Sequence, residues 1–389
     1  MGPPTATLVW DDRFRAYDFG PEHPFTETSR WLAVRLLESG WAERPGGPGL
    51  ARIARIEPAA RPTLERFHAP EYLDLVERLD RRGKRELLDR GDTPSFPGCY
   101  EAAARIVGGT VTATRSVRAG PTHRALQPGG GLHHAHAGSA SGFCILNDVA
   151  VAIADALHEG VRRVAYVDID VHQGDGVMYG FYRDGRVLDI DVHETGRSIF
   201  PGTGEVHETG AGDGAGLKVN VPLPPGAGDA EFESVFLRLV PPMLDSFRPE
   251  LIVLQGGLDA HAGDGLGHLR YSMRSYEIAA RTLRELTREV GAAGLVVTGG
   301  GGYAPSNVAR GLALYGAVLL SDGDRLEVGD ALPEAWRREF EAATGAGAPR
   351  TLSDPPVPNP AGRPTGDTDR LIGELERHLG RRFPAVAPG

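Results

Sequence analysis

The sequence predicts an α/β protein whose core is a parallel β-sheet. Two observations indicate this class: short apolar segments alternate with segments of helical periodicity, and five of the apolar segments end in glycine-rich or acidic runs. The 389 residues could form two domains by length alone, but α/β sheets often form one large unit. Hydrophobic residues make up 41% of the chain, which is enough for a large buried core.

The helices and strands follow from these patterns in chain order. Residues 27–119 are expected to be mostly helical, and further helices are expected between the strands. Because ligands of parallel sheets bind beyond the carboxyl ends of the strands, the polar runs after the five strands predict one shared crevice. The expected helices are 29–39, 70–79, 147–159, 229–244 and 272–290, and the expected strands are 122–127, 164–167, 187–192, 251–255 and 295–298.

The alternating pattern weakens after about residue 321. Residues 342–365 are rich in Gly, Pro and Ala and are expected to form a linker or a surface wrap. Residues 367–383 have the apolar spacing of an amphipathic helix, which we expect to dock on the body or on a neighbouring subunit. The sequence therefore predicts a body of residues 1–340 and a tail of residues 341–389.

The composition restricts the partners and the compartment. A net charge of −10 argues against nucleic acid as the main partner, because phosphate binding requires a basic surface. Cys99 and Cys144 are too few for a disulfide framework, which favours a reducing cytoplasm. Residues 1–10 lack the pattern of a signal peptide, and no run reaches the roughly 18 apolar residues of a membrane span. We therefore expect a cytoplasmic protein that binds neither nucleic acid nor membranes.

Residues 164–175 join a buried strand to an acidic cluster. Successive strand residues point to opposite faces, so Asp168, Asp170 and His172 share one face if the strand continues that far. Two carboxylates and an imidazole at a buried strand end are costly unless a divalent cation neutralises them. Asp175 adds a third acid in the turn that follows. The pattern favours a metal site over a solvated strand end with incidental charges.

Asp259 is a candidate for a third metal ligand beside Asp170 and His172. It follows another buried strand and two glycines. Three protein ligands leave coordination positions for water and substrate, which is typical of catalytic metal sites. The turn around Asp259 is equally compatible with a helix N-cap.

Two adjacent histidines, His133 and His134, follow the glycine-rich end of another strand. Adjacent histidines suit a site that needs both an acid and a base. Asp168 and Asp175 are natural partners for the second ring nitrogens, where they would fix the tautomers and raise the basicity. We interpret His136 as a loop residue.

Four further residues each have a functional and a structural interpretation. The glycines at 299–302 could let a tight turn present the Tyr303 hydroxyl to a developing oxyanion, or Tyr303 could be a core residue. Phe143 and Phe200 lie beside glycines, where they could wall a narrow apolar channel or pack as ordinary loop residues. Asp92 is typical of a turn.

Six motifs follow one another along the chain: Gly130-Gly131-Leu132-His133-His134-Ala135, Ser141-Gly142-Phe143-Cys144, Tyr166-Val167-Asp168-Ile169-Asp170-Val171-His172, Phe200-Pro201-Gly202-Thr203-Gly204, Asp259-Ala260-His261 and Gly299-Gly300-Gly301-Gly302-Tyr303. In these motifs, over about residues 15–340, the chain closely resembles the zinc-dependent histone deacetylase superfamily. Residues 18–24 and the Asp259-Ala260-His261 motif most resemble its bacterial acetoin-utilisation branch. The resemblance implies the arginase-like α/β fold: one catalytic domain, residues 1–340, with a central parallel sheet of about eight strands and helices on both faces.

The resemblance also implies a role for each candidate residue. Those of the metal and acid–base chemistry are Asp170, His172 and Asp259 as ligands of Zn²⁺, His133 and His134 as the acid–base apparatus, Asp168 and Asp175 as their orienting partners, and Tyr303 as the oxyanion donor. Those of the substrate site are Asp92 at the rim and Gly142, Phe143, Phe200, Leu266 and Gly301 around the acyl-lysine tunnel. A structural K⁺ is implied at the carbonyls around Asp168, Asp170, His172, Asp191 and Val192.

The chain departs from the family pattern at three positions. Asp191 stands where many relatives have Ser, so the potassium site is expected to differ. Gln173 replaces a second His, outside the implied ligands, and Gly265 replaces a frequent Pro beside Leu266 in the tunnel wall. Residues after about 342 have no assigned counterpart.

The implied reaction is hydrolysis of an acetyl-lysine amide in a protein to acetate and a free amine. In this interpretation His134 is the more basic histidine and accepts a proton, and His133 supports the charge. Three alternatives remain: a deacetylase of small acetylated amines such as polyamines, a non-catalytic acyl-lysine binder, and an arginase-type dimanganese hydrolase. The sequence does not decide between Zn²⁺ and Fe²⁺ in the cell, and it does not give the oligomeric state.

Overall fold

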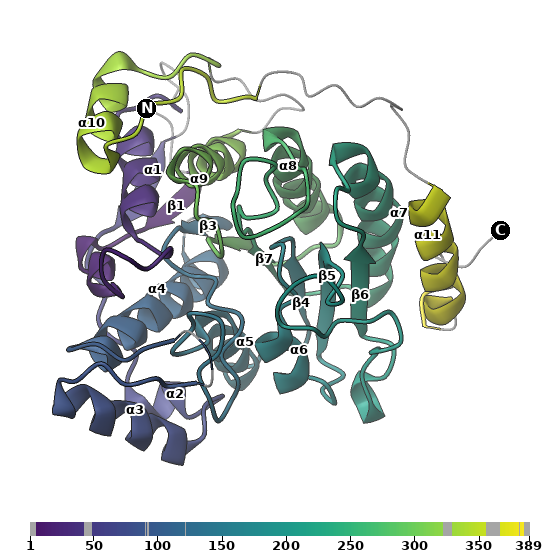
Figure 1. Cartoon of the computed structure of the whole chain (residues 1–389). Coiled ribbons are helices and arrows are strands. Elements are labelled where there is room, and N and C mark those ends of the chain that lie inside the picture. Colours follow the sequence, from purple (N-terminus) through teal and green to yellow (C-terminus); the bar gives the residue numbers. More distant parts are fainter. Residues whose placement is uncertain are drawn as a thin grey trace.

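The protein is built on one eight-stranded sheet in which every strand pairs in parallel (Figure 1). The computed structural model describes residues 5–42, 49–89, 91, 93–120, 122–321, 329–354, 366–380 and 382–384. The strands are β1 (Ala6–Val9), β2 (Leu50–Ile53), β3 (Arg124–Gln127), β4 (Val164–Asp168), β5 (Val187–Glu194), β6 (Lys218–Leu223), β7 (Leu251–Gln255) and β8 (Leu295–Thr298), in the spatial order β2-β1-β3-β8-β7-β4-β5-β6. The predicted fold class is confirmed.

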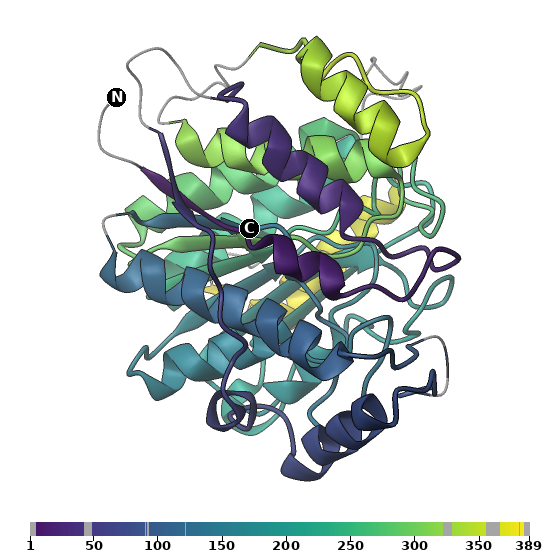
Figure 2. The same cartoon turned by 90° about the vertical axis from the view of Figure 1, so that its left-hand side faces the viewer.

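Helices cover both faces of the sheet. Helices α1, α9, α8 and α7 form one layer, and α4 and α5 form the other, with the strands between them (Figure 2). The central strands β4 and β7 are buried along their whole length, which explains their continuous apolar sequences. The helices are α1 (Thr28–Glu38), α2 (Arg61–Leu64), α3 (Pro70–Arg82), α4 (Cys99–Ala119), α5 (Asp148–His158), α6 (Asp175–Gly180), α7 (Asp229–Phe247), α8 (Met273–Glu289), α9 (Pro305–Leu320), α10 (Glu334–Thr344) and α11 (Gly366–Leu379).

All five predicted strands are present, whereas β1, β2 and β6 were not predicted from the sequence. β1 and β2 are only four residues long. β6 carries Lys218, Asn220 and Pro222, which hide its strand pattern. Proline is tolerated there because β6 is an edge strand, where one side of the backbone has no strand partner.

Described parts of the C-terminal region contact the body. Helix α10 crosses the predicted boundary at residue 340 and packs against α1, where Trp336 Nε1 donates to the Leu32 carbonyl at 2.8 Å. Further on, Asp354 Oδ2 lies 2.9 Å from His261 Nε2 in the loop after β7. The chain therefore continues to contact the body beyond residue 340.

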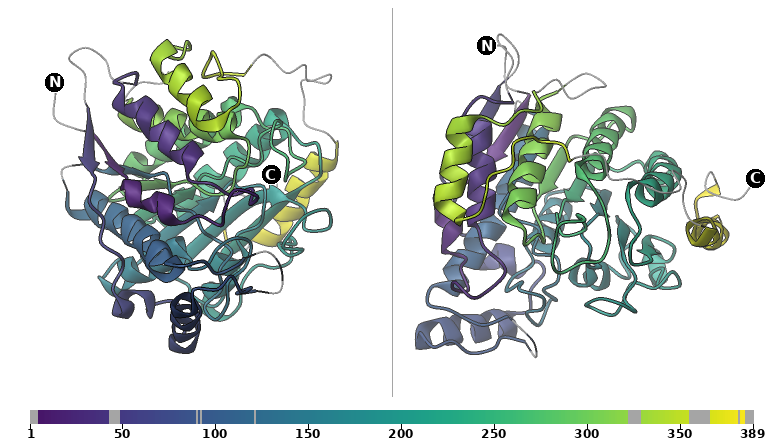
Figure 3. Two further views of the ribbon diagram at one scale, coloured as in Figure 1. Left: turned by 60° about the vertical axis from the view of Figure 1, so that its left-hand side comes forward. Right: turned by 45° about the horizontal axis from the view of Figure 1, so that its top comes forward.

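The amphipathic helix expected at 367–383 corresponds to α11. It lies against α7 and β6, at the opposite side of the molecule from α10 (Figures 1 and 3). Its apolar side chains Ile372, Leu375 and Leu379 are buried in this contact. Among the described residues, no helix is both long and apolar enough to cross a membrane.

Candidate active site

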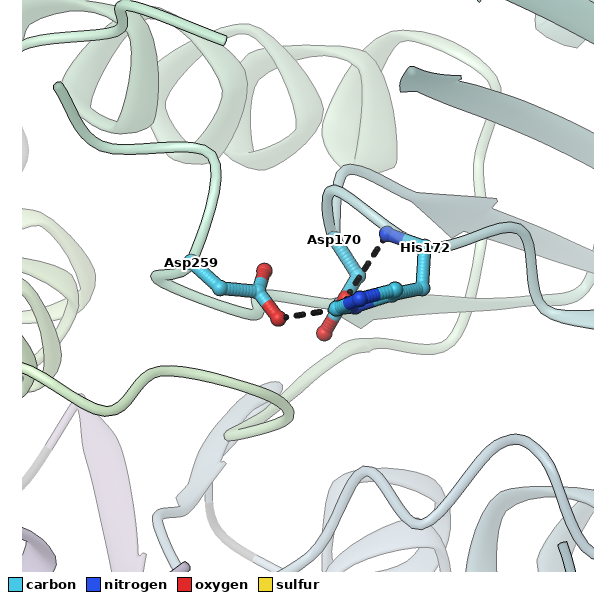
Figure 4. Close-up of side chains that lie close together, drawn as sticks. All are labelled: Asp170, His172 and Asp259. Carbon is cyan, nitrogen blue, oxygen red and sulfur yellow. Dashed lines mark hydrogen bonds and ion pairs between the residues drawn. The ribbon is translucent and has the colours of Figure 1, made fainter. Parts of the chain in front are cut away.

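Three side chains that could hold a metal converge at the carboxyl ends of two paired strands. Asp170 and His172 lie in the loop after β4, and Asp259 lies in the loop after its neighbour β7. His172 Nδ1 is 3.1 Å from Asp259 Oδ2 and 3.3 Å from Asp170 Oδ1 (Figure 4). The potential ligand atoms of the three residues all lie within 4.8 Å of one another, and all three residues are buried. The structure brings the predicted ligand set together.

Hydrogen bonds from neighbouring residues fix the two carboxylates. Asp170 Oδ2 accepts from the Gly301 N–H at 2.7 Å and from Gln255 Nε2 at 3.0 Å. Asp259 Oδ1 accepts from the Val171 N–H at 2.9 Å, so that Oδ2 faces His172. A Cβ on Gly301 would lie 1.9 Å from Asp259 Oδ2, and only glycine permits this approach of backbone to carboxylate.

The structure decides two points that the sequence left open for these residues. β4 ends at Asp168, so the strand alternation does not extend to Asp170 and His172, which reach the site from a loop. Asp259 is not a helix N-cap, because the next helix, α8, is capped by Ser272.

The electrostatics of the three residues suit a bound cation. Burial lowers the pKa of His172, but hydrogen bonds to Asp170 and Asp259 raise it more strongly, to about 10. Burial and the Asp170 carboxylate raise the pKa of Asp259 to about 7. Without a cation, a proton on His172 thus offsets the buried acids. Imidazole nitrogen and carboxylate oxygen both bind zinc, and three protein ligands leave a position for water, so Asp170, His172 and Asp259 fit a catalytic divalent cation such as zinc and would hold it.

Each histidine of the adjacent pair is held by its own carboxylate. His133 Nδ1 lies 2.7 Å from Asp168 Oδ2, and His134 Nδ1 lies 2.8 Å from Asp175 Oδ1. The two ring centroids are 4.0 Å apart. His136, which we interpreted as a loop residue, contacts the other oxygen of Asp175 at 3.1 Å. With Nδ1 donating to a carboxylate, each ring of the pair keeps Nε2 for chemistry.

The pKa values of the two rings are ordered opposite to the expectation from the sequence. Burial lowers the pKa of His133, but Asp168 and Asp170 raise it more strongly, to about 10. Burial and the nearby His133 lower the pKa of His134 to about 4, although Asp175 opposes this shift. With no cation on Asp170, these shifts favour the proton on His133 and leave His134 neutral. His134 is the weaker base, yet it is the ring that can accept a proton.

Tyr303 and Phe143 line the same pocket as the two histidines and the ligand candidates Asp170 and His172. Their rings meet edge to face at 6.0 Å between centroids. Phe143 adopts a φ of 67°, an unfavourable conformation for a bulky residue. Thr93 Oγ1 accepts from the Phe143 N–H at 2.9 Å, and Tyr17 OH donates to the Phe143 carbonyl at 2.7 Å, which together hold it there. Tyr303 is a pocket residue rather than a core tyrosine.

The other predicted substrate residues do not all line this pocket. Gly142 and Gly301 line the pocket. Phe200 stacks edge to face on His134, with 4.9 Å between centroids, and keeps 45% of its surface exposed. Leu266 is 40% exposed and lies in the loop that follows Asp259. Asp92, the predicted rim acid, lies outside the described residues.

The predicted potassium site has an unusual feature at Asp191. Its Oδ1 lies 2.7 Å from His193 Nδ1, and its Oδ2 accepts from the Gly174 N–H at 2.7 Å. Both oxygens therefore already have protein partners where many relatives carry a hydroxyl. The potassium site, with Val192 among its residues, stays a prediction.

Several residues that hold the site were not identified from the sequence. Asn147 Nδ2 donates to the carbonyls of His133 and Ala135, each at 2.9 Å, while Asp148 accepts from the Leu132 N–H at 2.7 Å. Asn147 also caps α5, and its N-cap pattern was the available signal for it. Gln255, at the end of β7, was visible only as a polar residue at a buried strand end.

Comparisons with known proteins agree with this geometry. The family model described as histone deacetylase domain matches residues 31–319. The acetoin utilization protein AcuC of Bacillus subtilis (strain 168) is 33% identical over 356 residues, covering 90% of each chain. The histone deacetylase clr6 of Schizosaccharomyces pombe is 34% identical over 317 residues, which cover 80% of this chain and 75% of that relative. The crystal structure of the HDA15 HD domain shares the fold, with a TM-score of 0.77 at 22% identity over 98% of this chain and 96% of that one. The chain belongs to the histone deacetylase family.

Proposed function

We propose that the protein is a zinc-dependent amidohydrolase that removes acetyl groups from acetyl-lysine in proteins and releases acetate. The observation that carries this proposal is one pocket lined by Asp170, His172, two carboxylate-held histidines and Tyr303, with Asp259 completing the metal-ligand triad beside it. A non-catalytic acyl-lysine binder would be expected to lack one of these groups, and all of them are present. We further propose that the reaction takes place in the cytoplasm.

Zinc, when bound, supplies a Lewis acid that polarises the amide carbonyl and lowers the pKa of a water molecule. His134, neutral at pH 7, accepts the proton of the attacking water at Nε2, while Asp175 holds Nδ1. His133, whose Nδ1 is held by Asp168, stabilises the negative charge that develops beside it. The Tyr303 hydroxyl donates a hydrogen bond to the oxyanion. The proton on His134 then passes to the leaving amine.

The replacement Tyr303→Phe tests this proposal most directly. It removes only the hydroxyl, so kcat on an acetyl-lysine peptide should fall about 100- to 1,000-fold. The zinc content and the thermal unfolding temperature should stay close to those of the wild type. Tyr179→Phe is the matched control, because the partly exposed Tyr179 donates its hydroxyl to Glu208 and does not line the pocket. If Tyr303→Phe turns over the peptide as fast as the wild type, the Tyr303 hydroxyl does not stabilise the oxyanion.

The metal is tested separately by elemental analysis of the purified protein. We expect one metal ion per chain, bound by Asp170, His172 and Asp259. Two ions per chain would instead support the dimanganese hydrolase. Removal of the metal by a chelator should abolish turnover, and adding back Zn²⁺ or Fe²⁺ in parallel should show which ion restores it.

The substrate class is tested by comparing turnover of acetyl-lysine peptides with that of acetylated polyamines. We expect the peptides to be preferred, because Phe200 packs on the pocket residue His134 and is partly exposed, so a peptide can contact it. If acetylpolyamines are turned over faster, the proposed amide hydrolysis stands but the proposed substrate class, acetyl-lysine in proteins, is wrong.

A further inference from the structure

Two loops beside the candidate site are packed on its functional residues. The first, residues 195–205, is named the Phe200 loop, and Phe200 stacks on His134. The second, residues 262–268, is named the Leu266 loop. In it, the Asp264 carboxylate accepts from the backbone N–H of Tyr303 at 2.7 Å. Both loops therefore have fixed contacts to groups of the site and carry an exposed apolar side chain at their tips.

One buried carboxylate joins these two loops. Glu194 is the last residue of β5 and is fully buried. Its Oε1 accepts from Ser198 Oγ of the Phe200 loop at 2.7 Å. Its Oε2 accepts from the backbone N–H of His268 in the Leu266 loop at 2.8 Å, and His268 Nδ1 lies 2.9 Å from Oε1. Each carboxylate oxygen is thus used, and both loops depend on the same side chain.

The backbone of Glu194 is also bonded to the loop that carries the metal-ligand candidates Asp170 and His172. The Glu194 N–H donates to the Val171 carbonyl at 2.9 Å, and Val171 precedes the ligand candidate His172. A buried carboxylate costs free energy unless hydrogen bonds satisfy it, so the native structure favours the loop positions that supply these donors. Glu194 therefore ties both loops to the end of β5 and, through Val171, to the loop of the metal-ligand candidates.

We propose that Glu194 is a positioning residue that sets the entrance of the pocket, and through it the preference for acetyl-lysine within a peptide over a small acetylated amine. The inference rests on the proposed deacetylase function. Phe200 and Leu266 remain 45% and 40% exposed. They are therefore available to the parts of a substrate that extend outside the pocket. A small amine lacks such parts and is held mainly by the pocket itself.

The replacement Glu194→Gln keeps the shape of the side chain but leaves one acceptor oxygen instead of two. The amide also presents N–H groups where a carboxylate oxygen accepted, and bonds to a neutral amide are weaker than bonds to a carboxylate, so both loops are held less tightly, by roughly a tenfold change. We expect KM for an acetyl-lysine peptide to rise about tenfold, with kcat and zinc content within twofold of the wild type. KM for an acetylated polyamine should stay within twofold. Glu250→Gln is the matched control: Glu250 also binds a backbone N–H and a side-chain donor, both of Arg162, but at the start of β7.

Two single-loop variants provide a second test if Glu194→Gln does not fold. Ser198→Ala releases only the Phe200 loop, and His268→Ala removes only the side-chain bond of the Leu266 loop. Each should raise KM for the peptide by a smaller factor than the loss of both bonds. His268→Asn, which restores a short side-chain donor, should recover part of the effect.

Amide hydrogen exchange separates this inference from the proposed function. Glu194→Gln should accelerate exchange in both loops, and Ser198→Ala only in the Phe200 loop, whether or not the protein hydrolyses any amide. If the wild type hydrolyses no acetyl-lysine but the variants change exchange in the two loops as expected, the proposed function is rejected. The role of Glu194 in holding both loops then still stands. The inference is overturned if Glu194→Gln lowers kcat or zinc content without raising KM, or if it leaves exchange in the two loops and KM for the peptide unchanged.

Discussion

At the scale of single residues, the two histidines of the site are distinguished by the groups around them rather than by their own chemistry. His133 contacts Asp168 and also faces Asp170, whereas His134 contacts Asp175 and shares that carboxylate with His136. Burial lowers the pKa of both rings, but the acids beside His133 raise its pKa more strongly, whereas His133 lowers the pKa of His134 further. Two adjacent and identical side chains thus acquire different roles.

The replacement Asp175→Asn should show how much catalysis depends on this arrangement. The amide can no longer accept from His134 Nδ1 as a charged group does, so the tautomer with a free Nε2 loses its support. We expect kcat to fall about 10- to 100-fold, with KM and zinc content little changed. His136→Asn, which alters the other partner of Asp175, is the control and should change kcat less than threefold. Equal losses in both variants would mean that Asp175 acts through His136.

His68, remote from the metal ligands, should make stability depend on pH. It is buried, its Nε2 accepts from the Asn147 N–H at 2.9 Å, and burial lowers its pKa to about 4. Because this folded-state pKa lies below the usual 6.5, the unfolded chain takes up a proton first as the pH falls. The contribution of neutral His68 to the unfolding free energy is fully present above about pH 6.5 and is lost as the pH falls from 6.5 to 4.

The variant His68→Gln checks this window, since its amide oxygen can still accept from Asn147. Between pH 7 and pH 5 the wild type should lose about 2 kcal/mol more unfolding free energy than the variant. Urea unfolding of both zinc-loaded proteins at the two pH values measures the difference. Parallel losses in the two proteins would contradict the assigned pKa.

The functional side chains could be predicted from the sequence because their chemistry is unusual at buried strand ends. Asp170, His172 and Asp259 are costly there without a cation, and the structure brings them together. Their geometry could not be predicted, because β4 ends before Asp170 and the loop path depends on contacts from distant residues such as Gln255. The positive φ of Phe143 likewise depends on tertiary partners and has no local signal.

At the scale of elements, strands were predictable where they are buried on both faces and carry uniform apolar sequences, as β4 and β7 do. The edge strand β6 was missed because an edge position permits charged residues and proline. Helix α11 was predictable from its apolar periodicity, but its position on α7 and β6 could not be predicted, since an amphipathic face does not specify its partner.

The docking of α11 can be weakened by one substitution. Leu375 is 1% exposed in this contact, so Leu375→Ala should remove about 2 to 5 kcal/mol of packing free energy. We expect amide exchange to increase throughout residues 366–379 while the amides of β4 and β7 keep their protection. The exposed change Arg377→Ala on the same helix is the control and should leave exchange nearly unchanged. Acceleration that spreads into the sheet would mean that α11 supports the whole fold.

At the scale of the whole molecule, the metal-ligand triad connects separate parts of the sheet. Asp170 and His172 come from the end of β4 and Asp259 from the end of β7, and Asp170 is also bonded to Gly301 after β8. A cation bound there would join the loops after β4 and β7, and the Gly301 hydrogen bond would link the end of β8 to the same site. Binding to the native state but not to the unfolded chain raises the unfolding free energy, by about 2.7 kcal/mol when free metal is at 100 times Kd.

Thermal unfolding of metal-free protein with increasing zinc should therefore show a midpoint that rises by several degrees. Asp259→Asn should abolish most of this rise, because the amide keeps an oxygen for the Val171 N–H but loses the negative charge directed at His172. Its metal-free midpoint should remain near that of the metal-free wild type, since the lost acid is one that repels Asp170. A zinc-dependent rise of the same size in Asp259→Asn would place the metal elsewhere in the protein.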